Sequence, residues 1–147
     1  METLITPSTP LSDCPTNLNL LDKREAALAV SAMGVPDITL DKTGRAVIKV
    51  RYFLCYADWL PREDGQGHDA VIYTVFISKD GNMFKTTGVY GPRAARAAAE
   101  LFSARDWEDG ITAVITERAT AKGRRAHSIQ WVIDAEDGVG PETKGGA

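Results

Sequence analysis

Cysteine and long apolar runs are both scarce in this chain of 147 residues. The two cysteines are Cys14, in a segment rich in Pro, Ser and Thr, and Cys55, inside an apolar run. We therefore expect no stapling disulfide, and Cys55 is predicted to be a small core residue. No apolar run approaches the roughly 18 residues that span a bilayer, and the first twenty residues lack the basic start and apolar block of a signal peptide. These absences predict a cytoplasmic protein that has no membrane partner.

Histidine is also rare, and recognisable catalytic motifs are missing. His68 and His127 have no second His or Cys at the spacing of zinc ligands. Four carboxylates gather around one predicted loop, namely Asp58, Glu63, Asp64 and Asp69. Their spacing matches no magnesium-binding motif, and the sequence contains no GxSxG, GxxxxGKS or HExxH. We expect no metal, no cofactor, no catalytic residue and a protein that is not an enzyme.

The composition predicts one globular domain between two irregular ends, since 44% of the residues are hydrophobic and 25% are charged. Residues 1–19 show no periodicity and are expected to form a flexible arm. Residues 136–147 are expected to form a flexible acidic tail. A single domain over 20–135 remains between them.

Two segments have the pattern of helices. Asp22 is a suitable N-cap for a helix over about 23–33, with Glu25 as its capping-box partner. Pro92 suits the first position of a second helix over about 92–104, where alanines favour the helical state. The apolar face expected for the first helix consists of Ala26, Ala27, Val30 and Met33.

Five segments have the β-branched and aromatic composition of strands. They cover about 46–58, 70–78, 82–88, 110–119 and 127–135. Asp80 and Gly81 predict a tight hairpin between the second and third strands. The basic stretch ATAKGRR, residues 119–125, connects the last two and contains no carboxylate.

This order of strands, with a helix between the third and the fourth, resembles the OB-fold over residues 46–133. That fold is a five-stranded, partly open barrel, and it binds ligands between the loops that join strands one to two and four to five. The resemblance therefore implies a mainly β fold with α, an OB-like barrel with an extra N-terminal helix. Its binding loops would be 58–69 and 119–126. The chain is most similar to small phage-type or bacterial single-stranded-DNA-binding proteins, although it lacks the Gln/Gly/Pro-rich linker and acidic tip of the best-known bacterial members.

The alternation of residues selects candidates for binding a single strand. In the long strand the even row from Ile48 to Tyr56 is expected in the core, which leaves the odd row on the other face. The residues expected to contact phosphates are Lys49, Arg51, Lys122, Arg124 and Arg125. The rings expected to stack on bases are Phe53, Trp59 and Phe76. A structural interpretation stays open for each, because the two phenylalanines can pack under the N-terminal helix and the cations can be solvated surface charges.

The net charge of -3 and the pI near 5.4 require that any anionic partner is met by a local basic patch. The expected function is non-sequence-specific binding of single-stranded DNA, or RNA, as an accessory of replication or recombination, with replication or repair proteins as further partners. The alternative is a protein-binding inhibitor or adaptor from a mobile genetic element. Its acidic segments 100–110 and 134–142 would meet a basic partner. The sequence leaves formation of a homo-oligomer open.

Overall fold

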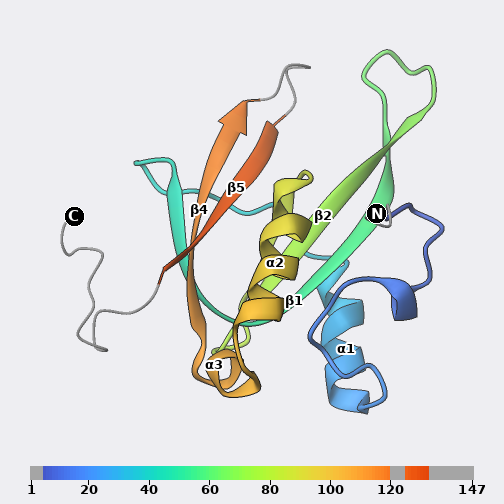
Figure 1. The fold of residues 1–147 in the computed structure, drawn as a ribbon. Coiled ribbons are helices and arrows are strands. Elements are labelled where there is room, and N and C mark those ends of the chain that lie inside the picture. Colours follow the sequence, from blue (N-terminus) through green and yellow to red (C-terminus); the bar gives the residue numbers. More distant parts are fainter. Residues whose placement is uncertain (1–4, 120–124, 133–147) are drawn as a thin grey trace.

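A computed structural model of the chain describes residues 5–119 and 125–132. Within these ranges a five-stranded antiparallel sheet is accompanied by short helices (Figure 1). The strands are β1 (Arg45–Pro61), β2 (His68–Ser78), β3 (Met83–Thr87), β4 (Ile111–Ala119) and β5 (Arg125–Val132). The helices are the 3-10 helix η1 (Leu11–Asp13), α1 (Lys23–Ala32), α2 (Tyr90–Leu101) and α3 (Ala104–Asp109). The prediction of a mainly β fold with a five-stranded sheet and helices is confirmed, and the sheet is not closed.

The sheet has the strand order β3-β2-β1-β4-β5. Three strands joined in sequence, followed by a fourth that returns to lie beside the first, form a Greek key. β1 pairs with β4 only over Arg45–Val50, whereas it pairs with β2 from Val50 to Pro61. The register shifts between Val50 and Tyr52, so Arg51 is an extra residue at a β-bulge.

The N-terminal segment lies beside β1 after Val50, where β1 no longer pairs with β4. Cys55 N donates to Pro15 O at 2.8 Å, and the Asn17 side chain accepts from Phe53 N at 2.8 Å and donates to Arg51 O at 3.1 Å. Ile5, Cys14 and Leu18 are buried. The expected flexible arm is therefore wrong for residues 5–19. The reason is that the Asn17 amide forms the hydrogen bonds to β1 that a neighbouring strand would otherwise form. The expected tail, 136–147, lies outside the described residues.

α1 begins where the sequence predicts, but it buries a different face. Asp22 caps it by accepting from Arg24 N at 2.8 Å. Ala29 and Ala32 are fully buried, whereas Val30 is 67% exposed and Met33 is 42% exposed. The expected apolar face was wrong, because the positions that α1 buries are Ala29 and Ala32.

α2 also depends on small residues for its close contact with the sheet. A Cβ atom on Gly91 would lie 2.5 Å from Thr74 Oγ1, so only glycine fits there without a shift. Ala95 and Ala98 of the same helix are buried as well. The helix begins at Tyr90, slightly before the predicted start, and ends at Leu101.

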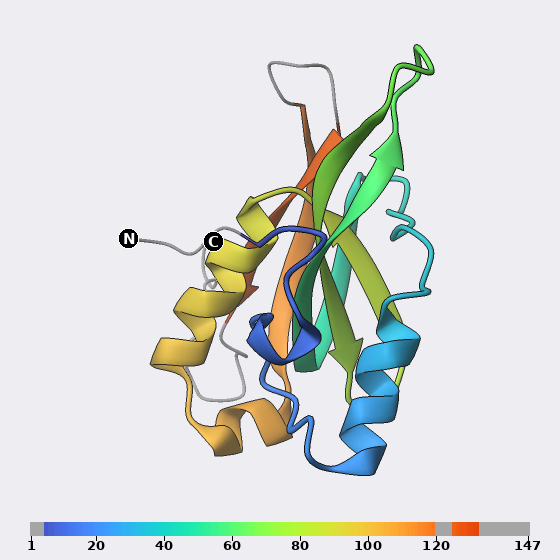
Figure 2. The ribbon, with the colours of Figure 1, turned by 90° about the vertical axis from the view of Figure 1, so that its right-hand side faces the viewer.

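The two faces of the sheet carry different helices. Figure 2 shows α2 and α3 on one side, here called the inner face, and α1 on the other, the outer face. An aromatic cluster fills the inner face, where Trp107 of α3 and Trp131 of β5 have ring centroids 5.8 Å apart. Trp131 is partly buried and donates from Nε1 to Ala94 O of α2 at 2.9 Å.

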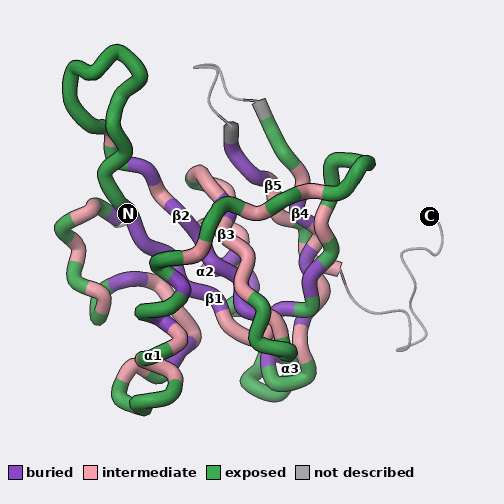
Figure 3. The backbone as a smooth tube through the Cα atoms, turned by 180° about the vertical axis from the view of Figure 1, so that it is seen from behind, coloured by how far each residue is buried: buried purple, intermediate pink, exposed green. Residues whose placement is uncertain are grey.

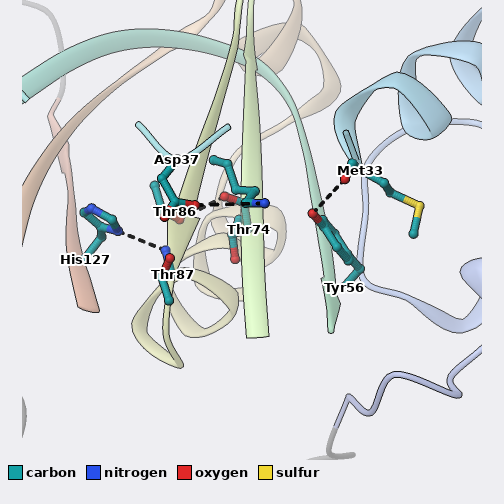
Figure 4. A network of polar contacts seen from close by, with 8 residues as sticks. Met33, Asp37, Tyr56, Thr74, Thr86, Thr87 and His127 are labelled. Atoms are coloured by element: carbon teal, nitrogen blue, oxygen red, sulfur yellow. Dashed lines mark hydrogen bonds and ion pairs between the residues drawn. The ribbon is translucent and has the colours of Figure 1, made fainter. Parts of the chain in front are cut away.

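The edge strands β3 and β5 approach each other at one end of the sheet. Thr87 N donates to Nδ1 of the buried His127 at 2.9 Å, as Figure 4 shows. A Cβ atom on the neighbouring Gly88 would lie 2.9 Å from Ala126 Cβ. The hydrogen bond from Thr87 N to the His127 side chain joins the two edges, and in the described ranges of β3 and β5 no ladder of backbone hydrogen bonds connects them.

Candidate nucleic-acid interface

Two of the three rings expected to stack on bases are buried. Phe53 is 2% exposed and Phe76 is 0% exposed. Phe53 packs on Trp107 with ring centroids 5.5 Å apart, and Phe76 packs on Trp131 at 5.9 Å. Their expected exposure is therefore wrong. The physical reason is that α2 and α3 cover this face, and α3 was not predicted from the sequence.

The bulge in β1 separates the predicted cations from the predicted ring. Because Arg51 is an extra residue, the alternation of faces shifts by one after Val50. Lys49 lies on the outer face and is exposed, whereas Phe53 lies on the inner face. The Arg51 guanidinium stacks over the Tyr52 ring, 4.2 Å from its centroid. The expected row of two cations and a ring on one face is therefore wrong.

Trp59 is the one predicted ring that is exposed. It lies near the tip of the β1–β2 hairpin, which projects from the body of the protein and is exposed at its end (Figure 3). Trp59 is 58% exposed, its neighbour Leu60 is 47% exposed, and Trp59 lines an open recess of about 410 Å³ together with His68. The hairpin is acidic, with the carboxylates Asp58, Glu63, Asp64 and Asp69 against one arginine, Arg62. Arg62 forms an ion pair with Asp69 at 2.9 Å.

The basic connection between β4 and β5 is only partly described. Lys122 and Arg124 lie outside the described residues, and Arg125 is described only as the first residue of β5. Arg118, near the end of β4, places its guanidinium 4.6 Å from the centroid of the Tyr90 ring. The end of β4 and the start of β5 point to the same end of the molecule as the β1–β2 hairpin (Figures 1 and 2).

The outer face of β2 and β3 is covered. Val75 and Ile77 on this face have exposures of 0% and 1%. Tyr56 of β1 donates from its hydroxyl to Met33 O at the end of α1, at 3.2 Å (Figure 4). The segment after α1 runs along β3, where Ile38 N donates to Lys85 O at 2.9 Å. These contacts leave little of that face accessible.

The outer face of the other half of the sheet is accessible. Its residues form three rows that cross the strands, and each row contains one residue from β1, one from β4 and one from β5. We call the following nine residues the open face: Arg45, Thr116 and Ser128; Val47, Val114 and Gln130; Lys49, Thr112 and Val132. None of the nine is buried, and none is a carboxylate. This surface was not predicted from the sequence, although the alternation of its residues with the buried Ile48, Ala113 and Ile115 was a signal for it.

The two cysteines, Cys14 and Cys55, are both buried. Burial raises the pKa of the Cys55 thiol to about 12, so this group does not act as a nucleophile at neutral pH. Burial likewise raises the pKa of Cys14. Within residues 5–119 and 125–132 no group of three or more His, Cys, Asp or Glu side chains could hold a metal ion.

Comparison with protein-family models, with curated proteins and with solved structures finds no match for this chain. In the described part of the chain, each helix is too short or too polar to cross a bilayer.

Proposed function

We propose that the chain is an OB-like protein that binds single-stranded DNA with little sequence preference. The observation that supports this proposal is the connectivity of the sheet. A Greek key places β4 beside β1, α2 follows β3 in the chain, and His127 joins the edges of β3 and β5. OB-folds are partly open Greek-key barrels of five strands that bind oligonucleotides through the loops after strands one and four.

In this proposal the cations around the β4–β5 connection contact the phosphates of the single strand. Lys122, Arg124 and Arg125 form a stretch without carboxylates in a chain whose net charge is -3. A local patch of this kind is sufficient for binding a polyanion, because phosphate contacts supply most of the non-specific affinity. Trp59 is the exposed ring on which a base can stack, and Lys49 and Arg51 remain candidate phosphate contacts.

Titration of a labelled oligo(dT) at two salt concentrations tests the proposal. Binding at micromolar protein in about 50 mM salt, with an affinity that falls as salt rises, is the expected result. A mixed-sequence single strand should bind within a few-fold of oligo(dT). Failure to bind either oligonucleotide under these conditions would contradict the proposal.

The β1–β2 hairpin favours a second candidate, a protein-binding adaptor. Its carboxylates would repel phosphates, while the exposed side chains of Trp59 and Leu60 offer apolar contacts to a basic protein. Reversing the hairpin charge with Glu63→Lys and Asp64→Lys distinguishes the two. If the hairpin lies near DNA, the variant binds oligo(dT) more tightly than the wild type; an unchanged affinity assigns the hairpin to another partner.

A further inference from the structure

The extra helix of this chain changes which surface of the sheet a ligand can reach. In OB-folds the face of strands two and three contributes to the binding of oligonucleotides. Here α1 and the segment that follows it occupy the outer face of β2 and β3, where Val75 and Ile77 are buried. Figure 2 shows α1 on the side of the sheet opposite to α2. A ligand that binds the sheet itself therefore needs a different surface.

The open face has the charge that a polyanion requires. The chain has 20 Asp and Glu against 17 Lys and Arg, yet the nine residues of the open face include two cations and no acid. Arg45 and Lys49 lie on the same face of β1, about 13 Å apart along the strand at roughly 3.3 Å per residue. Val47 lies between them and is 63% exposed.

The remaining side chains of the open face indicate how such a ligand would be held. Thr112, Thr116, Ser128 and Gln130 carry hydroxyl and amide groups, which contact phosphate and sugar oxygens in nucleic-acid complexes. None of the nine residues has an aromatic ring, so the face provides no platform for stacking a base. This combination favours recognition of the backbone over recognition of bases.

We propose that the open face carries the phosphodiester backbone of the single strand toward the β4–β5 connection. This inference rests on the proposed function and assigns it a surface. β4 and β5 each supply one residue to every row, and in the sequence the basic stretch joins these two strands. The backbone of the strand lies on Arg45, Lys49 and the polar side chains, and its bases point away from the sheet.

A matched pair of charge insertions tests this surface. Val47→Glu places a carboxylate between Arg45 and Lys49, and Val30→Glu places one on α1, at a side chain that is 67% exposed. Both variants change the net charge equally and both sites are open to solvent, so both should fold. At about 0.1 M salt, loss of one to two phosphate contacts corresponds to roughly a 5-fold to 25-fold weaker affinity for oligo(dT), because each contact contributes about 0.7 to the salt exponent. We expect that loss for Val47→Glu and less than a 2-fold change for Val30→Glu.

The same titration with an oligomer that lacks bases tests whether the face recognises the backbone. Val47→Glu should weaken binding of the abasic oligomer by the same factor as binding of oligo(dT), because the bases make no contact with this face. Charge removal gives an independent check: Arg45→Gln with Lys49→Gln should flatten the salt slope by about 1.4, and Lys23→Gln with Arg24→Gln should leave it unchanged.

The outcomes separate the two proposals. If the wild type binds oligo(dT) and Val47→Glu behaves like Val30→Glu, the open face does not bind the phosphodiester backbone, while the proposal of single-strand binding stands. If the wild type binds neither oligomer, single-strand binding and its assigned surface both fail. If polyglutamate displaces oligo(dT) at equal charge concentration, the face prefers an acidic protein segment and the inference is overturned.

Discussion

Replacing Trp131 tests how β5 is held on α2. Trp131 makes ring contacts with Phe76, Trp107 and Phe102, with centroids 5.9, 5.8 and 6.5 Å apart, and its Nε1 donates to Ala94 O. Truncation of a buried Trp to Ala costs about 3 to 5 kcal/mol. Because Trp131 is only partly buried, we expect Trp131→Ala to lower the free energy of unfolding by about 3 kcal/mol, at the lower end of that range.

Trp131→Phe separates the ring contacts from the hydrogen bond. It keeps an aromatic ring and removes the Nε1 donor, so we expect a loss of about 1 kcal/mol. For a chain of this size, about 2 to 4 °C per kcal/mol gives a fall in Tm of roughly 6 to 12 °C for Ala and roughly 2 to 4 °C for Phe. Urea unfolding followed by circular dichroism measures both. Leu101→Ala, at a side chain that is 80% exposed, is the control. If Trp131→Ala were no less stable than this control, the assignment of β5 to α2 through the aromatic cluster would be refuted.

Two further predictions concern the N-terminal segment and Cys55. Asn17→Ala should lower stability by about 1 to 3 kcal/mol and speed proteolysis before residue 20, because Phe53 N loses its acceptor. Ser12→Ala, at an exposed side chain of the same segment, is the control, and equal cleavage of both variants would count against the strand-like role of Asn17. Burial raises the pKa of Cys55 from 9.0 to about 12, so the folded chain favours the neutral thiol and its contribution to stability is lost as pH rises from 9 toward 12. Urea unfolding across this range should show a shallower decline for Cys55→Ala, and identical slopes would contradict the burial of the thiol.

The order of strands and helices was largely predictable from the sequence. β2 is a run of β-branched and aromatic residues, and Asp80-Gly81 marked its hairpin with β3. Alanine content and Pro92 marked α2. α3 was not predicted because it has only six residues. Ser103 and Asp106, which form a capping box at its start, were the signal for it in the sequence.

The candidate site was less predictable, because tertiary contacts decide which side chains are accessible. Nothing local in the sequence shows that Arg51 is an extra residue in β1, yet this bulge moves Phe53 to the face opposite Lys49. Likewise the pairing of Asn17 with β1 involves residues more than thirty positions apart. The open face follows from the registers of three strands, which alternation alone does not fix.

The salt dependence of oligo(dT) binding, measured from about 50 to 200 mM salt, tests the central claim most directly. The wild type should bind, and the triple variant Lys122→Gln, Arg124→Gln and Arg125→Gln should lose up to about 2 units of the log-affinity versus log-salt slope, about 0.7 for each phosphate contact. Its Tm should stay close to that of the wild type, because cations that serve the ligand and not the fold seldom change stability by more than about 0.5 kcal/mol each. An unchanged slope together with a clearly lower Tm would show that the basic stretch serves the fold and would contradict its role in binding a single strand.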